Sequence, residues 1–64
     1  MKVIFAKDET GGIIVEKNLD IVPLIGEVVN ILLPDEGSQI ERYEVTRRVF
    51  FIFPSGDDVI VFLK

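Results

Sequence analysis

Hydrophobic residues in this chain occur in short runs that are separated by turn-forming residues. The runs are rich in β-branched and aromatic residues, and Gly, Pro, Asp and Ser stand between them, which is the pattern of β-strands joined by reversals. No segment shows the i, i+3, i+4, i+7 spacing of an amphipathic helix, although residues 19–25 could hold a single helical turn. We therefore predict five strands, at residues 2–6, 13–16, 28–33, 39–53 and 59–63.

The fourth predicted strand, residues 39–53, is longer than an ordinary strand of about 5 to 6 residues. Such length indicates a bend or bulge, which we place near Arg47-Arg48. Before the bend, apolar and polar positions alternate, and after it both faces become apolar. The alternating positions are Tyr43 and Val45 on one face and Arg42, Glu44 and Thr46 on the other.

Strands of this kind with short connections predict one all-β domain over residues 1–64. We expect a small five-stranded antiparallel meander in sequential order, curled into an SH3-like or OB-like barrel. The bent fourth strand would turn the corner of that barrel.

The run Val22-Pro23-Leu24-Ile25-Gly26-Glu27-Val28-Val29, followed by Tyr43-Glu44-Val45 and a closing hairpin, resembles the pattern of small SH3-like barrel proteins of bacteria and their phages. This resemblance implies a fold and no activity. SH3 domains that bind proline-rich peptides carry several aromatics, Trp among them, in one groove. This chain has no Trp, so proline-rich ligands are not expected.

The closing hairpin, formed by the runs at residues 49–53 and 59–63, lacks a polar face. One apolar set would fill the barrel, and the other would form a surface that soluble monomers rarely expose. We predict that the chain forms a homo-oligomer, with a dimer favoured. An alternative is a two-layer monomer in which the N-terminal hairpin folds over the outer set. The predicted self-association face contains Phe50, Ile52, Ile60 and Phe62, and the opposite face contains Val49, Phe51, Phe53, Val59, Val61 and Leu63.

The content of charged and reactive residues narrows the classes of function. Cys and His are both absent, which removes thiol and imidazole catalysis, Cys/His zinc sites and disulfides, so we expect no enzyme activity, cofactor or metal. A net charge of -4 argues against direct binding of nucleic acid. No apolar run has the roughly 20 residues of a membrane span, and no signal peptide is recognisable, so we expect a cytoplasmic location.

Acidic pairs occupy three predicted reversals, at Asp8-Glu9, Asp35-Glu36 and Asp57-Asp58. In a meander the first and third reversals lie at the same end of the sheet, which would gather four carboxylates at one pole. Such a pole could hold a cation or meet a basic partner by imitating nucleic-acid phosphates. The other interpretation is that these acids serve the turns and keep the protein soluble.

Basic and aromatic residues of the fourth strand form a second candidate surface. Arg and Tyr are over-represented among residues that dominate binding energy. We therefore predict a protein-binding surface, although Arg42 and Arg48 could instead form ordinary cross-strand ion pairs. Its predicted members are Arg42, Tyr43, Arg47 and Arg48.

These features predict a non-catalytic protein–protein interaction module that self-associates through its terminal hairpin. An alternative is a small phage or mobile-element protein that inhibits a host nucleic-acid enzyme through acidic mimicry. A third hypothesis is a structural subunit of a ring or filament.

Overall fold

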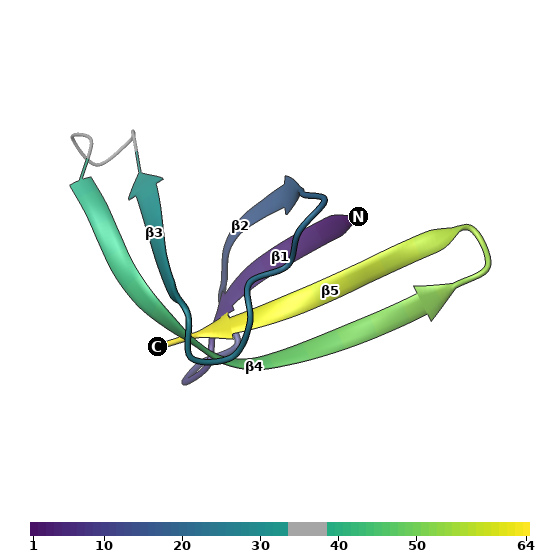
Figure 1. The fold of residues 1–64 in the computed structure, drawn as a ribbon. Helices are drawn as coiled ribbons and strands as arrows, with labels where there is room; N and C mark the ends of the chain where they lie inside the picture. Colours follow the sequence, from purple (N-terminus) through teal and green to yellow (C-terminus); the bar gives the residue numbers. More distant parts are fainter. Residues whose placement is uncertain (34–38) are drawn as a thin grey trace.

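The computed structural model describes residues 1–33 and 39–64 and contains five strands in one curled sheet, shaped as a half-barrel (Figure 1). The all-β prediction is confirmed, and residues 19–25 form a loop instead of a helical turn. No helix among the described residues is long and apolar enough to cross a membrane. The strands are β1 (Lys2–Lys7), β2 (Ile13–Asn18), β3 (Val28–Leu33), β4 (Gln39–Phe53) and β5 (Gly56–Leu63).

The order of the strands is β2-β1-β5-β4-β3, so the predicted sequential meander is wrong. Strand β1 lies parallel to β5, the other neighbours are antiparallel, and β2 and β3 form the two edges of the sheet. A strand that is apolar on both faces is stabilised at the centre of a sheet. Sequential order would leave β5 at an edge, whereas the observed order places it between β1 and β4.

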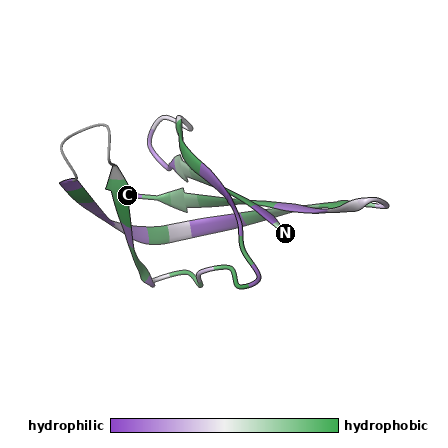
Figure 2. Ribbon diagram, turned by 90° about the horizontal axis from the view of Figure 1, so that it is seen from above, coloured by the Kyte–Doolittle hydropathy of each residue, from purple (hydrophilic) through white to green (hydrophobic). Residues whose placement is uncertain are grey.

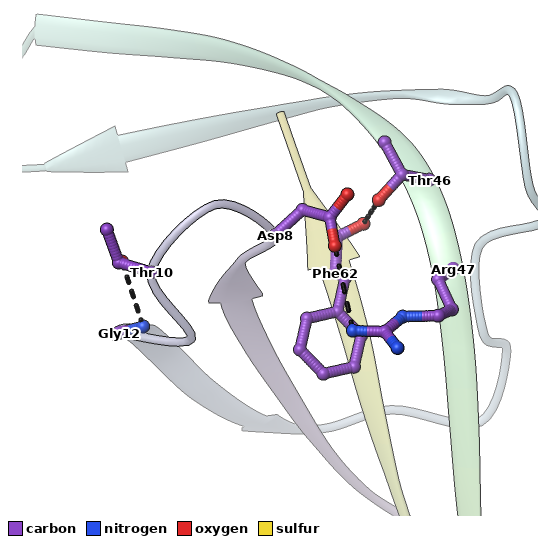
Figure 3. A network of polar contacts seen from close by, with 6 residues as sticks. All are labelled: Asp8, Thr10, Gly12, Thr46, Arg47 and Phe62. Atoms are coloured by element: carbon purple, nitrogen blue, oxygen red, sulfur yellow. Dashed lines mark hydrogen bonds and ion pairs between the residues drawn. The ribbon is translucent and has the colours of Figure 1, made fainter.

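A β-bulge bends β4 at Thr46. Val45 lies opposite Leu63 and Arg47 lies opposite Phe62, which leaves Thr46 as the extra residue. The Thr46 hydroxyl donates a hydrogen bond to the backbone carbonyl of Phe62 at 3.2 Å (Figure 3). The predicted bend near Arg47-Arg48 is therefore confirmed, immediately before those two arginines.

Replacing Thr46 with Val should lower the free energy of unfolding by about 1 kcal/mol, because the Phe62 carbonyl loses a donor while the shape of the side chain is kept. Urea denaturation would measure the change. Thr10→Val is the matched control, since its hydroxyl accepts only an exposed turn bond from the Gly12 N–H. Equal effects of the two substitutions would contradict a stabilising role for the bulge contact.

The hydrophobic core lies on the concave face of the sheet. Leu19 and Val22, from the loop between β2 and β3, pack against it. Backbone hydrogen bonds anchor this loop, because the Leu19 N–H donates to the Met1 carbonyl and the Gly26 N–H donates to the Val45 carbonyl. The loop therefore covers part of the hydrophobic core on the concave face of the sheet. The buried residues are Val3, Phe5, Ala6, Ile31, Val45, Val59, Val61 and Leu63.

The N-terminal hairpin, β1 and β2, extends the sheet beside β5. It does not form a second layer over the terminal hairpin, so the predicted two-layer arrangement is wrong. The reason is that β1 satisfies the backbone hydrogen bonds of β5 along its edge, which requires both strands to share one sheet. The convex face of the terminal hairpin consequently has no second layer over it among the described residues.

Candidate functional site: the terminal arm

The end of the β4–β5 hairpin projects from the body of the molecule, and we call residues 49–58 the terminal arm (Figures 1 and 2). Strand β3 pairs with β4 only as far as Glu44, and β1 pairs with β5 only from Asp58 onward. The arm therefore extends past its neighbours, and the molecule measures 40 × 21 × 21 Å.

Large apolar side chains are exposed on both faces of the arm. The exposed fractions are 43% for Phe50, 41% for Phe51, 73% for Ile52 and 50% for Phe53. Consecutive strand residues point to opposite faces, so Phe50 and Ile52 are exposed on one face and Phe51 and Phe53 on the other. Single exposed apolar residues are ordinary, and this concentration of four on one projecting strand makes the arm a candidate contact surface.

The register of the hairpin corrects the predicted self-association face. Directly opposite residues share a face of a sheet, and Phe50 lies opposite Val59 while Val49 lies opposite Ile60. Phe50 and Ile52 thus belong to the concave side, and Ile60 and Phe62 belong to the convex side. The prediction that these four residues share one face is wrong. Phe53 pairs with Gly56, so a turn of only two residues sets the register and Asp57-Asp58 belong to the strand.

Arg47 covers part of the convex face. Its guanidinium carbon lies 4.1 Å from the centroid of the Phe62 ring, and its Nη2 lies 3.6 Å from Oδ1 of Asp8 (Figure 3). A guanidinium over an aromatic face shields the ring and is attracted by it. Arg47 therefore joins the end of β1 to β4 and β5, which is a structural role.

Arg48 has different surroundings on the concave side. It lies opposite Val61, and its guanidinium carbon is 5.4 Å from the centroid of the Phe50 ring. Its Nε is buried and has no hydrogen-bond partner within the described part of the chain. The ion pairs among residues 1–33 and 39–64 involve neither Arg48 nor Arg42. The predicted cross-strand pairs of these two arginines are therefore not found there.

Arg42 and Tyr43 lie on the other side of the bulge from Arg47 and Arg48. They line an open depression together with Val28, Glu44 and Lys64. Arg42 alternates with Tyr43, and Arg47 alternates with Arg48, so each pair presents its two side chains to opposite faces. The structure thus divides the predicted basic surface into two separate places and does not bring its four members together.

The acidic pairs do not gather at one pole. Asp58 lies opposite Lys2 at the start of β1, whereas Asp8 follows the end of that strand. At about 3.3 Å per residue, the two carboxylates stand about 20 Å apart. The gathering of these two pairs at one pole is therefore wrong, because β1 and β5 run in the same direction, which sets the end of β1 and the start of β5 at opposite ends of the sheet. Asp35-Glu36 lie outside the described residues.

Ion pairs also involve the acids near β1. Lys2 Nζ lies 3.6 Å from Glu16 Oε1 and 3.8 Å from Asp58 Oδ2, and Asp8 pairs with Arg47. Within the described ranges, no three potential ligands group together in a way that could hold a metal ion. Asp8 and Asp58 therefore serve local pairing, whereas Asp57 belongs to no ion pair among the described residues.

Sequence reasoning missed one feature of the arm, the edge of β4 that β5 leaves open. The order of β3, β4 and β5 is the same in the predicted meander and in the structure, so the open edge arises from the unequal lengths of these strands. Its available signal is the length of β4, because a strand of 15 residues extends beyond neighbours of 6 and 8 residues.

Comparison with known proteins gives no match: no family model fits the chain, and no curated protein or solved structure is significantly similar to it.

Proposed function

We propose that this chain is a non-catalytic interaction module that self-associates through its terminal arm. The observation that carries the proposal is the run of exposed apolar residues 50–53 on a hairpin that extends past the rest of the sheet. Burial of apolar surface stabilises association by about 25 cal/mol per Å². The mechanism is surface complementarity, and a closed two-fold dimer is the simplest assembly that covers the arm.

The SH3-like or OB-like class of the sheet stays a prediction from the resemblance. A closed barrel would require the β2 and β3 edges to pair, and these two strands stand at opposite ends of the described strand order. The proposed function rests on the arm and holds for an open or a closed sheet.

Ile52→Lys should convert the dimer to a monomer, because an ammonium group at the centre of an apolar interface loses its hydration. Light scattering coupled to size exclusion, over a dilution series at low and high salt, would measure the mass. Ile13→Lys is a matched control on an edge strand, since Ile13 is 71% exposed and Ile52 is 73% exposed. We expect the control to remain dimeric.

A monomer at every concentration of the unmodified chain would contradict the proposal. A dimer that both substitutions leave intact would place the interface elsewhere. High salt should leave the dimer intact because the buried surface is apolar, whereas salt screens attraction between exposed charges. A complex with a basic partner that dissociates in high salt would instead support acidic mimicry.

A further inference from the structure

The β4 edge opposite β5 is open beyond the bulge. Before it, β3 pairs with β4, and the Val45 N–H and carbonyl bond to Glu27 and Gly26. From residue 47 to residue 53, β4 has β5 on one side and no paired strand on the other among the described residues. An open edge of this length presents unpaired backbone N–H and C=O groups, which are a template for another strand.

Backbone alternation identifies which residues present these groups. Glu44 and Lys64 exchange both backbone hydrogen bonds, whereas the Leu63 carbonyl accepts from Asp8 on the β1 side. Every second residue of β5, counted back from Lys64, therefore bonds toward β4. Their partners in β4 are Arg47, Val49, Phe51 and Phe53. The N–H and C=O groups of the residues between them, Arg48, Phe50 and Ile52, consequently point to the open edge.

We propose that this edge pairs with the same edge of a second copy, antiparallel, with the two-fold axis at Phe50. The inference rests on the proposed function and specifies its interface. The open edge is bounded by the bulge at Thr46 and by the turn at Pro54, and Phe50 is its midpoint. An axis at Phe50 therefore pairs the whole open edge of one copy with that of the other. The β4–β5 turn of each copy then lies beside the bulge of its partner.

Charge complementarity selects this register. With Phe50 on the axis, Arg48 lies opposite the partner's Ile52. Because Ile52 lies opposite Asp57 within its own hairpin, the partner's Asp57 is the next residue across the sheet on the same face. Two strand spacings separate the Cα atoms of Arg48 and that Asp57 by about 10 Å, within reach of an extended Arg and an Asp. Neither residue belongs to an ion pair among the described residues. Each dimer would gain this pair twice.

The neighbouring register, with the axis at Val49, offers no such gain. It places Arg47 opposite the partner's Phe51 and beside the partner's Asp58. Both charges already have partners within their own chain, since Arg47 pairs with Asp8 and Asp58 pairs with Lys2. The same register places Arg48 beside the partner's Phe50 and the partner's Val59, where its Nε still lacks an acceptor.

Disulfide trapping tests the register, because the chain has no native Cys. Phe50→Cys should oxidise to a covalent dimer, since hydrogen-bonded residues opposite each other have Cα atoms about 5.5 Å apart, within disulfide range. Phe53→Cys is the matched control on the same strand. Its two copies would be offset by six residues, about 20 Å along the strands, and should remain reduced. Equal cross-linking of both variants would overturn the inference.

Charge reversal gives a second, independent test. Arg48→Asp should raise the dimer dissociation constant at least about tenfold, because the introduced carboxylate would face the partner's Asp57. Combining Arg48→Asp with Asp57→Arg should restore the original value, and circular dichroism would confirm that all variants fold. A dimer unaffected by the single reversal would overturn this register and leave the proposed function standing. A monomeric unmodified chain would overturn both.

Discussion

Val3→Asp is expected to unfold the protein. Val3 is 0% exposed and lies opposite Lys17 on one side and Val59 on the other. A carboxylate there is buried without a partner, which costs several kcal/mol in addition to the lost apolar contacts. A domain of this size has a total stability of only about 3 to 10 kcal/mol. Circular dichroism and the dispersion of amide NMR signals would report the loss of structure.

The neighbouring residue provides the control for Val3→Asp. Lys2 also lies in β1, and its ammonium pairs with Glu16 and Asp58 at the surface. Lys2→Ala should therefore change the free energy of unfolding by less than about 1 kcal/mol. A folded Val3→Asp variant with native stability would show that β1 is not central to the sheet.

Leu63→Ala is expected to lower the free energy of unfolding by about 3 kcal/mol, within the range found for buried Leu truncations. Leu63 is 1% exposed, lies opposite Val45 across the bulge and packs in the core. Truncation removes apolar contacts and leaves a cavity that the surrounding strands fill only in part. Urea denaturation, with a check that the slope is unchanged, would measure the effect.

Leu24→Ala is the matched control, because Leu24 is 57% exposed in the loop between β2 and β3. We expect a change below about 0.5 kcal/mol there. Comparable losses for the two substitutions would contradict the assignment of Leu63 to the core.

The positions of the strands follow from local pattern. The predicted runs begin and end within a few residues of the observed strands, because β-branched residues favour the extended backbone and Gly, Pro and Asp favour reversals. The bend in β4 also follows from local pattern, since the alternation ending at Thr46 changes to continuous apolar sequence. The strand positions and the bend are therefore set by residues that are close together in the sequence.

The arrangement of the candidate site could not be predicted in the same way. The face shared by Phe50 and Val59 depends on a turn of two residues at Pro54-Ser55, and a longer turn shifts every side chain of one strand relative to the other. The position of Lys2 opposite Asp58 depends on the pairing of β1 with β5, which are far apart in the sequence. Neither pairing has a signal in a short stretch of sequence.

The sequence by itself determined an all-β chain, the apolar character of its terminal hairpin and the lack of Cys and His chemistry, because composition and local spacing specify these properties. The tertiary structure alone decided that β5 lies beside β1, that Arg47 covers Phe62 and that Phe50 shares a face with Val59. The physical reason is that strand pairing is non-local: any extended segment offers the same backbone donors and acceptors, and burial of the whole set of apolar faces selects the partners.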